Sequence, residues 1–93
     1  MNMKGITLAD TVKWMLSDDY KERLKAEYYQ TAIRYNLLKT MTLKIMTWKN
    51  KDDPEAKPIS SLELLEDQAI MMKYYLQVLA ERADIEGINL DLE

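Results

Sequence analysis

The sequence predicts an all-α protein: a short N-terminal helix plus a long antiparallel helical hairpin, assembled into a homo-oligomeric bundle. Only two glycines and two prolines occur in the 93-residue chain, so it has few places to turn. Apolar residues recur every three or four positions, which is the helical period. They occupy two sides of each long stretch, and a helix that is apolar on two sides needs neighbours on both. We expect one domain over residues 1–93, with helices at about 8–16, 19–49 and 60–86.

The first predicted helix is short. Thr7 can cap its N-terminus, and Asp10 falls in its opening turn. We expect it to end near Ser17, with one apolar side formed by Leu8, Val12, Met15 and Leu16.

The second predicted helix is long. Asp19 is its expected N-cap, because Glu22 follows three residues later as the partner in a capping box. A helix of about 30 residues makes a rod of roughly 45 Å. One broad apolar side consists of Leu24, Tyr28, Ala32, Tyr35, Leu38, Leu43, Ile45 and Met46. Another side carries Ile33, Leu37, Met41 and Trp48.

The third predicted helix has strong signals at both ends. Ser60 is the expected N-cap, Glu63 closes a capping box, and Ile59 with Leu64 forms a hydrophobic staple. Gly87 supplies the left-handed residue that ends the helix, and Ile88 is placed to cover that end. An inner stripe, expected to face the second helix, consists of Leu62, Leu65, Ala69, Met72, Leu76, Leu79 and Ala83. A second stripe consists of Leu64, Met71, Tyr74, Tyr75, Val78 and Ile85.

The doubled stripes are the reason for predicting a homo-oligomer. The short helix can cover only part of the excess apolar surface, so other copies of the chain are expected to cover the rest. The pattern does not determine the copy number.

The composition narrows the possible functions. The chain has no histidine and no cysteine, which removes the commonest general base and the usual ligands of transition metals. We therefore expect no enzyme, no cofactor and no metal site. A formal net charge of -3 argues against a nucleic-acid partner. No apolar run approaches the ~18 residues that span a bilayer, so we expect a cytoplasmic protein that does not bind membranes.

One line along the second helix has a polar first half. Arg23, Glu27, Gln30 and Arg34 step by four, three and four positions. A hairpin register with Trp48 opposite Ser61 places Arg34 near Tyr75, Glu27 near Arg82, and Arg23 near Glu86. These charges are either partly exposed ion pairs that set the register, or parts of a pocket in which Arg forks bind phosphate and Tyr rings stack on a base.

Two end motifs resemble a family of small phage and prophage proteins named after a gene product of a crAss-like phage. They are "DYKERLKAEYYQTAIRY", residues 19–35, and "RADIEGI", residues 82–88. The similarity covers roughly Trp14 to Leu90. Relatives often show Cys-Pro before the last helix, where this chain has Lys57-Pro58, so a role for that cysteine cannot apply.

The architecture also looks like that of phage anti-CBASS and anti-Thoeris sponge proteins. These proteins capture cyclic nucleotides or cyclised ADP-ribose signals without destroying them. The likeness implies a phage anti-defence protein that sequesters a bacterial immune signalling nucleotide in the cytoplasm of the host. In this hypothesis Arg23, Arg34 and Arg82 contact phosphates, Tyr20 or Tyr28 stacks on the base, and Gln30 reads its edge.

A second hypothesis is a protein inhibitor or adaptor that binds a host protein. Its contact surface would be the stripe of Met71, Tyr74, Tyr75 and Val78. A monomer with this stripe exposed would favour the adaptor, whereas a closed oligomer would favour the sponge.

Overall fold

The computed structural model describes residues 5–46 and 60–92. Over these residues it is helical, without strands, so the predicted all-α class is confirmed. The elements are a 3₁₀ turn η1 (Ala9–Thr11), a short helix α1 (Val12–Met15), and two long helices, α2 (Tyr20–Met46) and α3 (Leu62–Glu86).

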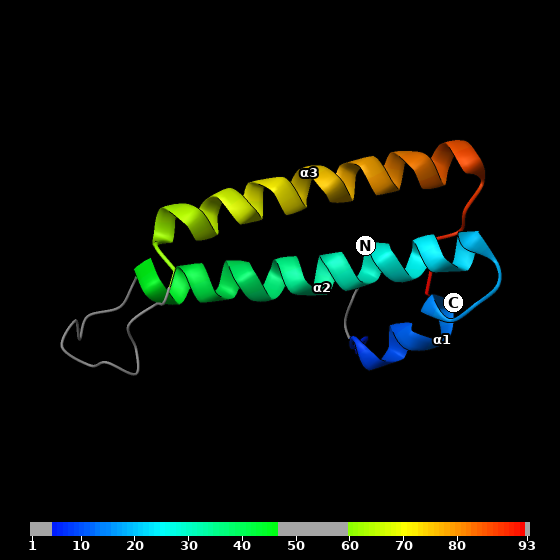
Figure 1. Ribbon diagram of the computed structural model, residues 1–93, viewed down its shortest axis with the longest axis horizontal. Coiled ribbons are helices and arrows are strands. Elements are labelled where there is room, and N and C mark those ends of the chain that lie inside the picture. Colours follow the sequence, from blue (N-terminus) through cyan, green and yellow to red (C-terminus); the bar gives the residue numbers. More distant parts are fainter. Residues whose placement is uncertain (1–4, 47–59, 93) are drawn as a thin grey trace.

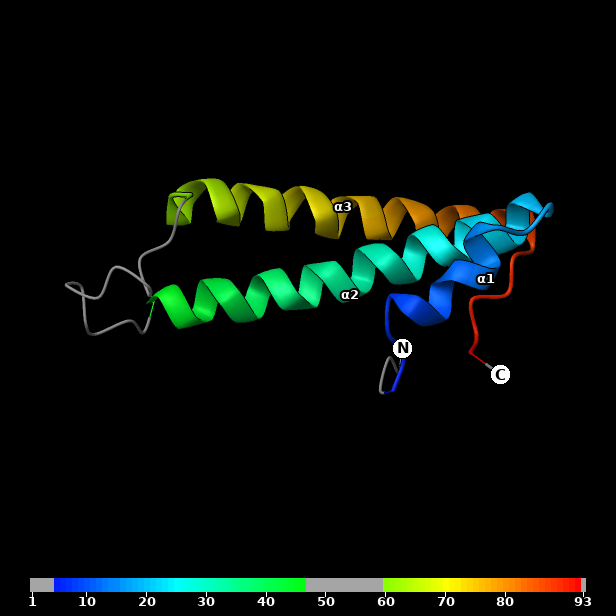
Figure 2. The same ribbon diagram turned by 60° about the horizontal axis from the view of Figure 1, so that its bottom comes forward.

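Helix α2 lies in the middle of the structure. α3 runs antiparallel beside it, and η1 with α1 packs on the opposite side (Figures 1 and 2). Among the described elements, α1 contacts α2 and not α3. Trp14 of α1 packs on Tyr29 of α2 with ring centroids 6.0 Å apart, so this contact fixes α1 on that side.

The main core lies between the first half of α2, the second half of α3 and the residues that follow α3. Its buried members are Leu24, Tyr28, Tyr29, Leu79, Ala83 and Ile88. The predicted inner stripe of α3 is confirmed, because all of its residues are buried or half-buried. The second half of α2 has only α3 beside it, and Leu37 and Met46 there are each 62% exposed.

The first turn is organised differently from the prediction. Thr7 does not cap it as a hydrogen-bond acceptor. Instead the Asp10 carboxylate accepts from the Thr7 backbone N–H at 2.8 Å and from the Thr7 hydroxyl at 3.1 Å. The ionised carboxylate is the stronger acceptor, so the threonine becomes the donor.

Asp19 and Ser17 both accept backbone hydrogen bonds at the start of α2. Asp19 is confirmed as a cap, since its Oδ1 accepts from the Lys21 N–H at 2.9 Å. The Asp19 N–H, which a capping box would direct to Glu22, instead donates to the Ser17 hydroxyl oxygen at 3.1 Å. The predicted end of this helix, including Trp48, lies outside the described residues, and α2 ends at Met46.

The N-cap of α3 is one residue later than predicted. Ser61, not Ser60, has the extended backbone of a cap, and its Oγ accepts from the Leu64 N–H at 3.1 Å. Two adjacent serines have the same capping chemistry, so the pattern of residue types alone does not decide between them. Ile59 of the predicted staple lies outside the described residues, and Leu64 is 59% exposed.

The C-terminus of α3 is as predicted. Gly87 has φ 68° and ψ 34°, the left-handed conformation that glycine adopts without a Cβ clash. The Ile88 N–H donates to the Ala83 carbonyl at 2.8 Å, and the Ile88 side chain is buried against the core. The chain after Gly87 therefore folds back onto α2.

Candidate functional site

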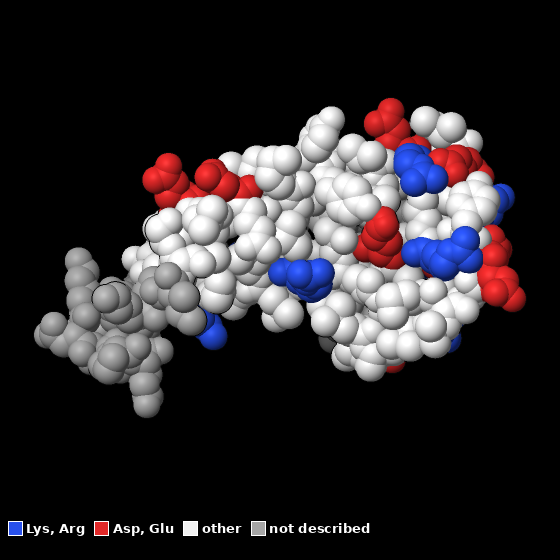
Figure 3. Space-filling view, viewed as in Figure 1, with Lys and Arg blue, Asp and Glu red and all other residues white. Residues whose placement is uncertain are grey.

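Charged side chains of both signs gather where α2 begins and α3 ends (Figure 3). We call this surface the polar face. It consists of Tyr20, Arg23, Glu27 and Arg34 of α2 with Tyr75, Arg82 and Glu86 of α3. On α2, Arg23 and Arg34 lie four residues before and seven residues after Glu27, on the same side of the helix.

Arg82 and Glu86 form the ion pair at the centre of this face. The Arg82 Nε donates to Glu86 Oε2 at 2.7 Å, and Nη2 donates to Oε1 at 3.2 Å, which is a two-pronged contact. The Arg82 guanidinium lowers the pKa of Glu86, and the Glu86 carboxylate raises the pKa of Arg82. Hydrogen bonding to Glu86 raises the pKa of the Tyr20 phenol, which places Tyr20 at the same pair.

Neither of the two predicted ion pairs between the helices forms. Glu27 accepts from the Tyr75 hydroxyl at 2.5 Å rather than pairing with Arg82. Arg23 donates through Nη1 to the Ser17 carbonyl at 2.8 Å rather than to Glu86. Tyr75 stands seven residues before Arg82, so this contact is offset by one heptad from the predicted register. A shift of seven leaves the same apolar stripes in contact, so the hydrophobic pattern alone cannot detect it.

Two of the predicted ligand-binding residues lie away from the polar face. Tyr28 is buried in the core, and its ring meets Tyr29 edge to face with centroids 5.4 Å apart. Gln30 is half-buried beneath the first turn, where its Nε2 donates to the Thr11 hydroxyl at 2.9 Å and contacts the Met15 sulfur at 3.4 Å. The polar residue Gln30 thus lies against η1 and α1, an association that the spacing along α2 does not reveal.

The other four predicted residues are exposed on the polar face. Tyr20 and Arg82 meet at Glu86, Arg23 is bound to the Ser17 carbonyl, and Arg34 lies two turns beyond Glu27. Neither Arg23 nor Arg34 forms an ion pair with any described residue. The sequence interpretation placed Tyr75 beside Arg34 but assigned it to the second apolar stripe of α3, so Tyr75 was not among the predicted ligand-binding residues.

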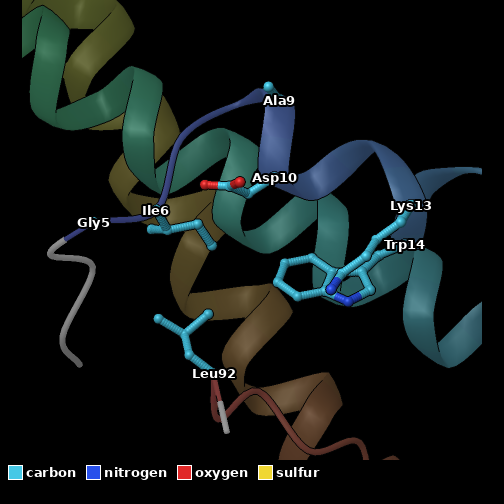
Figure 4. A pocket seen from close by; sticks show the side chains of 7 residues that line it. All are labelled: Gly5, Ile6, Ala9, Asp10, Lys13, Trp14 and Leu92. Carbon is cyan, nitrogen blue, oxygen red and sulfur yellow. The ribbon is translucent and has the colours of Figure 1, made fainter.

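A separate hollow lies between the first turn and the C-terminal segment. Its volume is about 470 Å³, and Figure 4 shows its lining residues Gly5, Ile6, Ala9, Asp10, Lys13, Trp14 and Leu92. The Asp10 carboxylate in it is already bound to Thr7. The hollow is lined by none of the predicted ligand-binding residues.

The described residues contain no group of three or more carboxylates that could hold a metal ion. None of the helices in the described ranges is long and apolar enough to cross a membrane. What the described structure presents is a small all-helical protein with a mixed polar and aromatic face.

The model of the Sequestin family matches residues 18–85, most of the chain, and the protein belongs to this family. The match includes both long helices and every residue of the polar face except Glu86. The family name indicates sequestration of a ligand, which is a binding role rather than a catalytic one. No curated protein and no solved structure shows significant similarity to the chain.

Proposed function

We propose that the protein sequesters a bacterial immune signalling nucleotide without chemical conversion and so acts as a phage anti-defence protein in the cytoplasm of the host. The ligand class is a cyclic nucleotide or a cyclic ADP-ribose type of molecule. The family name supports sequestration. The observation that carries the ligand class is the polar face, where Arg23 and Arg34 lie on one side of α2 without an ion-pair partner among the described residues.

The side chains of this face match a phosphorylated planar ligand. A guanidinium presents a planar fork that binds phosphate oxygens in pairs, so Arg23 and Arg34 are the proposed phosphate contacts. Tyr20, 46% exposed at the same end, offers a ring on which a base can stack, whereas Tyr28 is in the core. Arg82 is already bound to Glu86 through two of its nitrogen atoms, so only its remaining N–H donors are available to a phosphate.

We also propose that the protein works as a homo-oligomer. Large apolar side chains stand exposed along both long helices, among them Leu37, Met46, Met71 and Tyr74, each more than 60% exposed. Apolar surface on this scale is typical of a face that another protein covers. A shared interface would bring the polar faces of several chains together around the ligand.

Native mass spectrometry of the protein purified from cells that express a nucleotide-signalling defence system tests this function. The expected spectrum shows the protein with an added mass of a few hundred daltons per site, in the range of a phosphorylated nucleotide. A protein that carries no added mass in any defence background would contradict the proposal.

Arg34→Ala tests the site. We expect loss of the added ligand mass with the oligomer mass unchanged, because the variant removes a phosphate contact on an exposed surface. Lys73→Ala, an exposed cation of α3 that is not on the polar face, is the control and should retain the ligand. Retention of the ligand by the Arg23→Ala, Arg34→Ala and Arg82→Ala variants alike would place the site elsewhere.

The exposed stripe of α3 supports a second candidate, an inhibitor or adaptor that binds a host protein. Met71 and Tyr74 are 64% and 63% exposed and supply the Met and aromatic chemistry common at protein interfaces. Mass in solution separates the two candidates. A monomer that carries no ligand and retains a host protein during purification would favour the adaptor.

A further inference from the structure

The outer side of α3 is apolar along most of its length, and most of it is exposed in the described structure. Val78 is half-buried, and the Tyr75 hydroxyl donates to Glu27 of α2. Leu64, Met71, Tyr74 and Ile85 are 59%, 64%, 63% and 76% exposed. In Figure 3 the middle of α3 is a white area between acidic residues near its start and charges of both signs near its end. At 100° per residue the residues of this side fall within about 50° of one line along the helix. We call them the outer seam: Leu64, Asp67, Met71, Tyr74, Tyr75, Val78, Arg82 and Ile85.

The spacing of the residues along the outer seam is the same from either end. Its members are separated by three, four, three, one, three, four and three residues, which is a palindrome centred between Tyr74 and Tyr75. A two-fold axis through that centre pairs each seam position of one α3 with a seam position of an antiparallel second α3. Two-fold interfaces require a patch that is complementary to itself. Any face of a regular helix allows such a pairing of positions, so the side chains at the paired positions decide whether the two copies fit.

We infer that a second copy of this chain docks on the outer seam, with the two α3 helices antiparallel and the two-fold axis between Tyr74 and Tyr75. Leu64 then faces Ile85 of the other copy, Met71 faces Val78, and Tyr74 faces Tyr75. The spacing of three and four residues is that of helices that pack with interlocking side chains. This inference deepens the proposed self-association and is independent of the identity of the ligand.

Charge complementarity supports the same register. The seam has two charged positions, Asp67 and Arg82, and the two-fold axis places the acid of each copy opposite the base of the other. Asp67 makes no ion pair with any described residue of its own chain. Arg82 uses two of its nitrogen atoms on Glu86, and a guanidinium has five N–H donors, so donors remain for a second carboxylate.

The composition of the surface also fits a second copy. The seam combines exposed apolar side chains with one acid and one base. A partner with a different sequence would need to supply the same mixture of apolar and charged positions. A second α3 supplies it in the matching order.

Disulfide trapping tests the register. The natural chain has no cysteine, so any cross-link comes from introduced residues. We expect Met71→Cys and Val78→Cys chains to cross-link when mixed under mild oxidation. Neither variant should cross-link efficiently with itself, because identical positions are then offset by about 10 Å along the helix axis. Ile70→Cys, which lies on the exposed polar side of α3, is the control and should not cross-link to the Val78→Cys chain.

Charge reversal gives a second test without cysteine. In a homodimer of Asp67→Arg chains, each introduced arginine faces Arg82 of the other copy. In a homodimer of Arg82→Asp chains, each introduced aspartate faces Asp67 of the other copy. Each homodimer should therefore dissociate at least about tenfold more readily than the natural protein. An equimolar mixture restores both opposite-charge pairs, so heterodimers should dominate when measured by native mass spectrometry of mass-tagged chains.

The outcomes separate this inference from the proposals above. Efficient cross-linking of the Met71→Cys and Val78→Cys chains, together with rescue on mixing the charge variants, supports the outer seam. An oligomer that shows neither result overturns the seam but not self-association. A monomer under all conditions overturns both, and the ligand mass carried by that monomer still decides the nucleotide proposal.

Discussion

At the scale of single residues, burial and hydrogen bonding change the pKa of four tyrosine phenols. Burial raises the pKa of Tyr28 and of Tyr29, and hydrogen bonds to carboxylates raise the pKa of Tyr20 and of Tyr75. In each case the fold favours the neutral phenol. The folded state therefore holds protons that the unfolded chain releases above pH 10. This contribution to stability is complete below pH 10 and is lost as the pH rises through the raised pKa values of the folded state.

Tyr28→Phe tests this reasoning. Phenylalanine fills the same core position without an ionisable group, so the variant should lose less stability than the natural protein between pH 9 and pH 11. The measurement is the free energy of unfolding in urea across this range. The lysines titrate equally in both proteins, so their contribution to the loss of stability cancels when the two proteins are compared. Equal losses in the two proteins would show that burial of Tyr28 does not contribute to the alkaline transition.

At the scale of elements, α3 is delimited by a side-chain cap at its N-terminus and a backbone cap at its C-terminus. Ser61 satisfies the Leu64 N–H, and Gly87 in the left-handed conformation lets its own N–H and that of Ile88 bond to the Ala83 carbonyl. Such bonds are formed by groups that an α-helix otherwise leaves without partners. The helix is held by these local bonds and by its inner stripe together.

Ser61→Ala should lower the free energy of unfolding by about 1 kcal/mol, because the Leu64 N–H loses its acceptor. Ser60→Ala is the matched control, one residue earlier and with the same chemistry, and it should have little effect. Chemical denaturation of both variants measures the difference. A larger effect at Ser60 would return the cap to the position that the capping-box pattern predicts.

At the scale of the whole molecule, the segment after Gly87 ties the layers together. It leaves the end of α3 and passes along α2 toward α1 (Figure 2). Ile88 is buried in the core, the Tyr29 hydroxyl donates to the Leu90 carbonyl, and the Lys25 ammonium donates to the Asp91 carbonyl at 2.5 Å. The Lys25 ammonium also lies 4.7 Å from the Trp14 ring centroid, which connects the segment to α1.

Ile88→Ala should lower the free energy of unfolding by about 2–4 kcal/mol, because it leaves a cavity in the core that α2 and α3 share. Leu92→Ala is the control. Its side chain is 39% exposed, so its loss should cost less than about 1 kcal/mol. Thermal and chemical unfolding should remain single transitions. A small effect of Ile88→Ala would mean that the C-terminal segment packs only loosely on the core.

The sequence by itself determined the helical class, the inner stripe of α3 and the glycine that ends it. These features follow from local spacing and from backbone conformation, which neighbouring residues decide. The tertiary structure decided the position of α1, the capping serine and the register between α2 and α3. It also moved Tyr28 and Gln30 away from the polar face and brought Tyr75 to Glu27. A shift of one heptad leaves the same apolar stripes facing each other, although each residue then has a different partner, so only packing of the complete molecule selects one register.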